Sequence, residues 1–85
     1  MNVLEILLEI PKDEEHPDEV LTNRIGTLHA FNDTNFANPD DYTGEAKIWL
    51  DEFMKIKNIE KRKDAVNHAV NELHAKLMSL DVESG

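Results

Sequence analysis

The stretch that decides the fold runs from residue 44 to residue 80 and reads GEAKIWLDEFMKIKNIEKRKDAVNHAVNELHAKLMSL. In its first part, apolar residues recur with the spacing of one helix face, at Ala46, Trp49, Leu50, Phe53, Met54 and Ile56. From Ile59 on the spacing becomes a heptad, with one series at Ile59, Val66, Leu73 and Leu80 and a second at Val70 and Leu77. The pattern predicts helices over residues 44–57 and 58–81.

Asn58 lies where these two helices meet, and the sequence allows two arrangements. Asn58 caps a fresh helix after a tight turn, which gives a C-terminal hairpin, or it sits inside one long helix. A hairpin buries both apolar faces within one molecule. A continuous helix would leave the heptad seam exposed, and another chain would have to cover it.

Working towards the N-terminus, residues 32–43 are rich in Asn, Asp and Pro and predict an ordered loop, pinned to the core by Phe36 and Tyr42. Thr43 is the expected N-cap of the helix that follows. A helix is predicted over 17–31, with Pro17 in its first turn, and Gly26 within it is expected to permit close approach of another helix. A short helix is predicted over 1–11, ended by Pro11, and residues 82–85 are expected to fray.

These elements predict one all-α domain, a small bundle of three to four helices spanning residues 1–85. The expected core takes its residues from all the predicted helices. They are Leu4, Leu7, Leu8, Val20, Leu21, Ile25, Leu28, Phe31, Trp49, Leu50, Phe53, Ile56, Ile59, Val66, Val70, Leu73 and Leu77.

The amino-acid composition excludes several classes of function. The chain has no cysteine, which excludes disulfides, thiolate metal sites and cysteine nucleophiles and is typical of a reducing compartment. Its N-terminal residues lack the basic region and the cleavage site of a signal peptide, and its apolar runs are too short for a membrane span. We expect a cytoplasmic protein that does not contact membranes.

The sequence has few candidates for metal ligands or catalytic residues. Asp64, His68 and Glu72 are spaced four residues apart on one helix, a weak metal-site pattern that is more typical of a solvated face. Isolated histidines, here His16 and His29, are more often structural than catalytic, although His29 is a candidate for a buried or pocket position. We therefore expect no catalytic residues, no metal and no cofactor, and a binding protein rather than an enzyme.

Charge is distributed unevenly. Residues 1–52 carry thirteen acids and three cations, a net charge of −10, whereas residues 53–85 carry five acids and six cations, a net charge of +1. A field of one sign attracts an oppositely charged surface. The asymmetry predicts a protein partner with a basic surface. The contact acids that we expect are Asp13, Glu14, Glu15, Asp18, Glu19, Asp40 and Asp41.

Acids on one surface can imitate the phosphates of a nucleic acid and occupy an enzyme's basic groove. Small phage-borne inhibitors of restriction and CRISPR nucleases use that logic, and this chain is similar to them in composition alone. The similarity implies an anti-defence DNA mimic that inhibits or regulates a nucleic-acid-processing enzyme. The competing interpretation is that the net charge only maintains solubility.

Two other functions remain open from the sequence. A structural protein would assemble into a homo-oligomer through the heptad seam, formed by Ile59, Val66, Val70, Leu73, Leu77 and Leu80. A helical oligomer would hold a small anion with Lys61, Arg62 and Lys63. Direct nucleic-acid binding is not expected, because the acidic half would repel a polyanion.

Overall fold

The described part of the chain forms four α-helices and no strand, in agreement with the predicted all-α fold. The computed structural model describes residues 3–36, 41–42 and 44–84, with the side chains of the last helix described as far as residue 80. The helices are α1 (Val3–Leu8), α2 (Pro17–Asp33), α3 (Glu45–Met54) and α4 (Ile59–Ser84).

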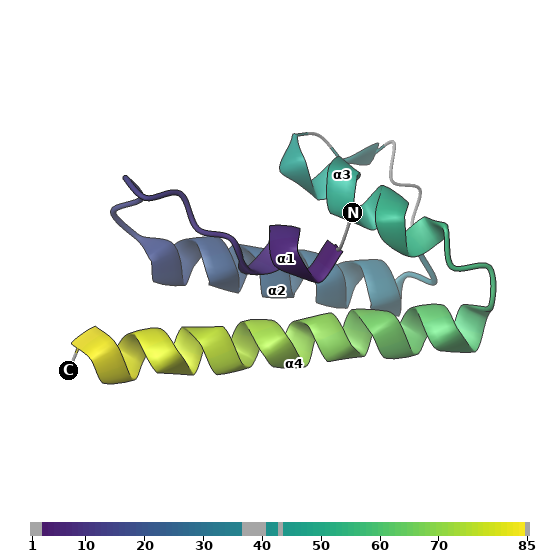
Figure 1. Ribbon diagram of the computed structural model, residues 1–85. Helices are drawn as coiled ribbons and strands as arrows, with labels where there is room; N and C mark the ends of the chain where they lie inside the picture. Colours follow the sequence, from purple (N-terminus) through teal and green to yellow (C-terminus); the bar gives the residue numbers. More distant parts are fainter. Residues whose placement is uncertain (1–2, 37–40, 43, 85) are drawn as a thin grey trace.

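Two long helices, α2 and α4, lie side by side and run in opposite directions, and the short helices α1 and α3 lie over them (Figure 1). The molecule is elongated, measuring 41 × 23 × 23 Å. The loop between α1 and α2 lies at one end of the long axis, beside the C-terminal end of α4, and the turn between α3 and α4 lies at the other end (Figure 1).

The core fills the space between the two layers. Its buried residues come from all four helices, as predicted, and are Leu7, Leu21, Ile25, Leu28, Phe31, Trp49, Leu50, Phe53, Val66, Ala69, Val70 and Leu73. Two predicted core residues are wrong. Ile59 is 59% exposed at the first position of α4, and Val20 is only half-buried and is not among the residues that pack against the core. Ala69 was not predicted, since a small residue adds little to an apolar pattern.

Asn58 does break the C-terminal segment, so the hairpin alternative is the correct one. After α3, the amides of Lys55 and Ile56 bond to the carbonyls of Glu52 and Phe53, which tightens the chain into a turn. The Asn58 side-chain oxygen then accepts a hydrogen bond of 3.0 Å from the Lys61 amide. This N-cap satisfies a donor that the first turn of α4 leaves free.

The other helix ends agree in part with the predictions. Pro17 begins α2 as expected, but α1 ends at Leu8, before Pro11, and α4 continues to Ser84 where a frayed tail was expected. The residue before α3 is Gly44, at φ 65°, a left-handed conformation that suits glycine. Thr43, the predicted cap, lies outside the described residues.

Gly26 does not provide a helix contact, which corrects the expectation for that position. It is exposed, and a Cβ atom built on it would meet nothing within 4 Å. Phe36 and Tyr42 pack against the core, as expected for the loop between α2 and α3. The Phe36 ring centroid lies 5.3 Å from that of Phe31.

Candidate functional site

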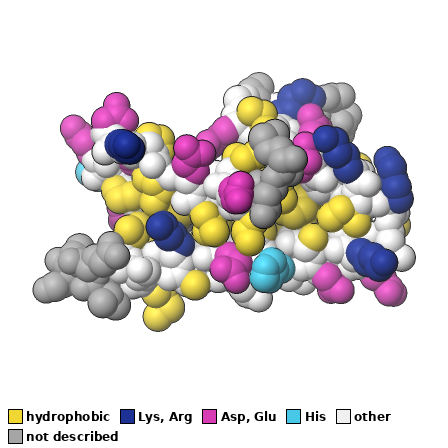
Figure 2. All heavy atoms as spheres, in the orientation of Figure 1, with side chains coloured by type: hydrophobic (Ala, Val, Ile, Leu, Met, Phe, Trp, Pro, Cys, Tyr) yellow, Lys and Arg dark blue, Asp and Glu magenta, His cyan; other side chains and the backbone are white. Residues whose placement is uncertain are grey.

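Five of the predicted contact acids gather at one end of the molecule. Asp13, Glu14 and Glu15 lie in the loop between α1 and α2, and Asp18 and Glu19 form the first turn of α2. Glu14 is half-buried, with Oε1 3.0 Å from the His16 amide that donates to it, and the other four acids are exposed. We call residues 13–19 the acidic end. Figure 2 shows magenta carboxylates at this upper left corner.

The remaining two predicted acids do not join the acidic end. Asp41 is exposed but lies in the segment that leads into α3, away from the loop between α1 and α2 (Figure 1). Asp40 lies outside the described residues. The fold therefore reduces the predicted set to the acids that are near one another in the sequence.

Four exposed lysines lie at the opposite end of the long axis, whereas the exposed Lys12 lies beside Asp13 at the acidic end and the exposed Lys76 lies in the C-terminal half of α4. Lys55 and Lys57 belong to the turn between α3 and α4, and Lys61 and Lys63 to the first turns of α4, which corresponds to the dark blue side chains at the right of Figure 2. Lys55 Nζ donates a hydrogen bond of 2.7 Å to Glu52, and this contact lowers the pKa of the Glu52 carboxyl. The two ends thus differ in their excess charge, although Lys12 lies at the acidic end and the exposed Glu60 and Asp64 lie among the lysines of α4.

Arg62 does not share a surface with Lys61 and Lys63, so the predicted anion-binding trio is not assembled. Its side chain is buried, and Nε and Nη2 donate to the Ile56 carbonyl at 3.0 and 2.7 Å. Its Cζ atom lies 4.7 Å from the centroid of the Phe36 ring. Arg62 fastens the turn before α4 and the loop after α2 to the start of α4.

The heptad seam is used inside the molecule. Val66, Val70 and Leu73 are fully buried in the core, and Leu77 and Leu80 are half-buried against it. Only Ile59 among the seam residues is exposed. A second copy of the chain would therefore find most of this seam already covered by α2.

The ladder of Asp64, His68 and Glu72 lies on an exposed face of α4. His68 Nε2 is 4.0 Å from Glu72 Oε1, and both side chains are substantially exposed. The part of the chain that the structure describes holds no cluster of three or more residues suited to a metal ion. His29 is exposed too, which corrects its candidate buried position.

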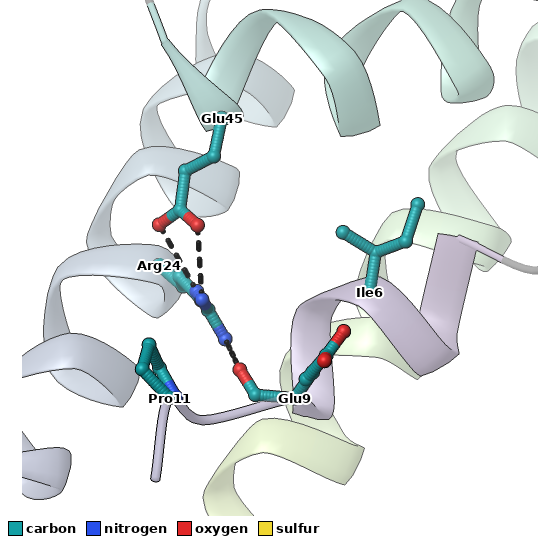
Figure 3. Close-up of a pocket in the computed structure, with 5 residues that line it drawn as sticks. All are labelled: Ile6, Glu9, Pro11, Arg24 and Glu45. Carbon is teal, nitrogen blue, oxygen red and sulfur yellow. Dashed lines mark hydrogen bonds and ion pairs between the residues drawn. The ribbon is translucent and has the colours of Figure 1, made fainter. Parts of the chain in front are cut away.

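A hollow of about 310 Å³ opens between α1, α2 and α3. We call it the Arg24 hollow. Its lining residues are Ile6, Glu9, Pro11, Arg24 and Glu45, with Ile6 and Glu9 facing Arg24 and Glu45 across it (Figure 3). The Arg24 side chain is only 5% exposed. Burying a cation costs free energy unless the cation is paired. The contacts of Arg24 therefore determine whether its guanidinium is free to bind a ligand in this hollow.

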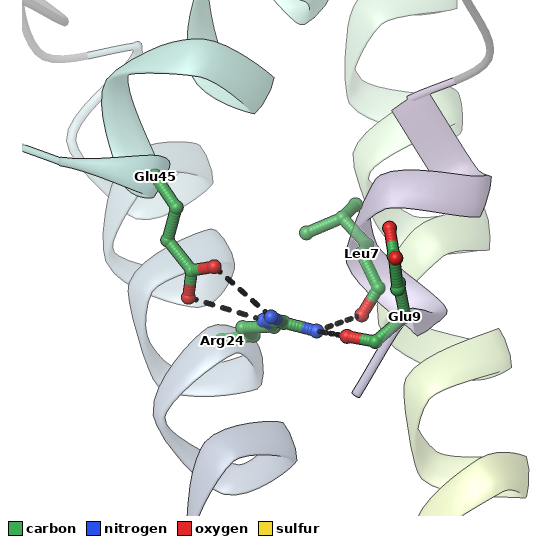
Figure 4. Close-up of polar contacts among 4 residues, drawn as sticks. All are labelled: Leu7, Glu9, Arg24 and Glu45. Atoms are coloured by element: carbon green, nitrogen blue, oxygen red, sulfur yellow. Dashed lines mark hydrogen bonds and ion pairs between the residues drawn. The ribbon is translucent and has the colours of Figure 1, made fainter. Parts of the chain in front are cut away.

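Arg24 joins three helices (Figure 4). Its Nη1 donates to the carbonyls of Leu7 and Glu9 at 2.6 and 2.7 Å, at the C-terminal end of α1. Its Nε and Nη2 donate to the two carboxylate oxygens of Glu45, at 3.3 and 3.0 Å, in the first turn of α3. The guanidinium is thus occupied by protein acceptors, and we call this set of contacts the Arg24 clamp.

The sequence predictions missed Arg24, although a signal was present. Arg24 falls within the apolar stripe of α2, one residue before Ile25 and three after Leu21, where a solvated cation is not expected. A cation at such a position indicates a buried side chain with acceptors from other segments. The identity of those acceptors follows only from the tertiary structure, since two of the three are backbone carbonyls.

A second hollow, of about 340 Å³, lies where α1 meets α3 and α4. We call it the Ala65 hollow, and most of its lining is apolar. The residues that line it are Val3, Leu4, Glu52, Phe53, Ile56, Ala65, His68 and Ala69. A mostly apolar depression with a few polar groups is the form that binding sites commonly take.

None of the helices in the described part of the chain combines the length and apolarity that a bilayer crossing requires. Comparisons with protein-family models, with curated proteins and with solved structures find no match to this chain. Functional inference therefore rests on the surfaces described above.

Proposed function

We propose that this protein binds a partner protein with a basic surface and blocks it, using the acidic end as its contact. The single observation that carries the proposal is the placement of Asp13, Glu14, Glu15, Asp18 and Glu19 together at one end of the molecule, with Lys12 as the one lysine or arginine in residues 11–19. A compact patch of one sign steers an oppositely charged surface and speeds its association.

Within the acidic end, the loop acids are the stronger contact candidates. Asp18 and Glu19 lie in the first turn of α2, where carboxylates also stabilise the positive end of the helix dipole. Asp13 and Glu15 lie in the loop, are exposed, and have no such role within a helix. They can approach a partner at little cost to the fold.

The partner class that we propose is a nucleic-acid-processing enzyme. Such an enzyme has a groove of lysines and arginines that binds phosphates, and several carboxylates on one short segment can replace those phosphates. The protein would then act by steric and electrostatic exclusion of the nucleic acid, as a cytoplasmic inhibitor of the anti-defence type, and would need no catalytic group of its own.

Charge reversal tests this proposal. Asp13→Lys, Glu14→Lys and Glu15→Lys are combined in one variant, and Asp33→Lys, Glu60→Lys and Asp64→Lys are combined in a control with the same change of net charge. All three control acids are exposed and lie outside the acidic end. Both proteins are tagged and used to capture partners from host lysate at about 0.1 M and about 0.5 M salt.

We expect the native protein to capture a basic nucleic-acid enzyme at the lower salt and to lose it at the higher salt. The acidic-end variant should associate with that enzyme at least about tenfold more slowly, whereas the control should retain most of the rate. Equal losses in both variants would mean that only net charge matters. Unchanged binding by the acidic-end variant would remove the acidic end from the interface.

The two alternatives from the sequence gain no support from the structure. Self-assembly through the heptad seam needs an exposed seam, and Val66, Val70 and Leu73 are buried. Anion binding by Lys61, Arg62 and Lys63 needs three free cations, and the Arg62 guanidinium donates to the Ile56 carbonyl. We therefore propose neither.

A further inference from the structure

Helix α1 has more apolar surface than the fold covers. Its sequence is VLEILL, and of its six residues only Glu5 is polar. Leu7 alone is fully buried, while Val3, Leu4, Ile6 and Leu8 are half-buried. A helix that is apolar on all sides is normally enclosed by protein, so α1 presents an apolar ridge that its own chain leaves partly open.

The two hollows lie along this ridge. Ile6 and Glu9 of α1 line the Arg24 hollow, and Val3 and Leu4 line the Ala65 hollow. Figure 2 shows yellow side chains continuing across this face between magenta ones. A ridge with depressions beside it can receive apolar side chains from an opposing surface, as in the docking of a helix into a groove.

Carboxylates surround the ridge. Those that line a hollow, lie on α1 or contact a lining residue are Glu5, Glu9, Glu45, Glu52 and Glu72. Two of these carboxylates are paired, Glu45 with Arg24 and Glu52 with Lys55. The excess of negative charge favours a basic partner and disfavours pairing of this face with the same face of a second copy.

We propose that the α1 ridge docks an amphipathic helix of another protein, whose apolar side chains enter the two hollows and whose lysines or arginines flank them. The Ala65 hollow is separate from the acidic end, because it is formed by α3 and α4 together with the start of α1, whereas the Arg24 hollow extends to Pro11, two residues before Asp13. The protein would then hold a partner by two contacts. One is the charged contact at the acidic end, and the other is the α1 ridge, which combines apolar side chains with flanking carboxylates.

A synthetic amphipathic peptide of leucine and lysine, about four helical turns long, is the probe. Its binding to the full chain is measured by fluorescence anisotropy at about 0.15 M ionic strength, beside a peptide in which glutamate replaces each lysine. Ala65→Phe fills the Ala65 hollow, and Ala75→Phe, at an exposed position on the same helix, is its control. Glu5→Lys reverses a charge on the ridge, and Asp33→Lys makes the same change at an exposed position at the end of α2, outside both proposed surfaces.

We expect saturable binding of the lysine peptide only, weakened about tenfold by Ala65→Phe and by Glu5→Lys and little changed by the two controls. Equal weakening by Asp33→Lys would reduce the binding to general attraction between opposite charges and overturn the proposal. So would unchanged binding by both ridge variants. Sedimentation that shows a native dimer, dissociated by Ala65→Phe, would assign the ridge to a second copy instead.

Discussion

The long helices and the short helices of this protein both contribute to the apolar core, but the short helices also depend on a buried arginine. α2 and α4, of 17 and 26 residues, pack along their length through apolar side chains such as Leu28 and Leu73. α1 and α3, of six and ten residues, offer far less length for packing. They are joined to each other and to α2 by the Arg24 clamp.

The difference shows how a small domain can add elements that could not pack alone. A six-residue helix is too short to be stable by itself, and its last carbonyls have no partners within the helix. The Arg24 guanidinium supplies those partners and, with the same planar group, holds the Glu45 carboxylate of α3. We therefore expect α2 and α4 to form the stable part of the molecule, and α1 and α3 a layer that needs the Arg24 clamp in addition to the burial of side chains such as Leu7 and Phe53.

The largest expected effect is on the packing between the long helices α2 and α4. Leu73→Ala should lower the free energy of unfolding by about 3 to 4 kcal/mol, because Leu73 is fully buried and a cavity would remain. Ile59→Ala, in the same heptad series, should cost well under about 1 kcal/mol, since Ile59 is 59% exposed. Urea denaturation followed by circular dichroism measures both. Similar losses would mean that the heptad, and not burial, sets the stability of α4.

A smaller effect is expected from a substitution that weakens only the attachment of the short helices α1 and α3. Arg24→Met removes the hydrogen bonds to the Leu7 and Glu9 carbonyls and should cost about 2 kcal/mol. Hydrogen exchange read by mass spectrometry should show amides of α1 and α3 losing protection while those of α2 and α4 keep theirs.

Arg24→Lys is the matched control, because it keeps the charge but cannot reach both carbonyls and both carboxylate oxygens at once. It should lose nearly as much protection in α1 and α3 as Arg24→Met does. Full protection in the lysine variant would show that the charge, and not the geometry of the clamp, holds the layer.

The smallest expected effect is a stabilisation of the long helix α2. Gly26→Ala should raise the free energy of unfolding by about 1 kcal/mol, because Gly26 lies inside α2 and a Cβ atom there would meet nothing within 4 Å. Thermal unfolding measures the gain. A loss of stability would indicate that a partner or another segment approaches α2 closely at this position.

Much of the fold could be predicted from the sequence, because long apolar stripes have one favourable solution. The stripe of Leu21, Ile25 and Leu28 identified α2, and the heptad identified α4. The break at Asn58 could not be decided, since the choice between a hairpin and a continuous helix depends on whether α2 covers the seam. Ile59 follows the same pattern as Val66, but it lies at the tip of α4, where the apolar pattern alone does not reveal its exposure.

The candidate site was predictable only where it is local in sequence. The acids from Asp13 to Glu19 are neighbours in the chain, so any fold brings them together. Asp41 was grouped with them by charge alone, and the fold separates it. Neither hollow was foreseen, because each is formed by residues from three segments that meet only in the tertiary structure.

Trp49 gives the molecule a built-in optical reporter. It is the only tryptophan in the chain, it is 2% exposed, and among the described residues its indole N–H has no hydrogen-bond acceptor. An indole in such dry surroundings emits at short wavelength, and contact with water shifts the emission to the red. Because Trp49 belongs to α3, the wavelength of its fluorescence emission reports whether the layer of α1 and α3 is attached to the long helices, and no added label is needed.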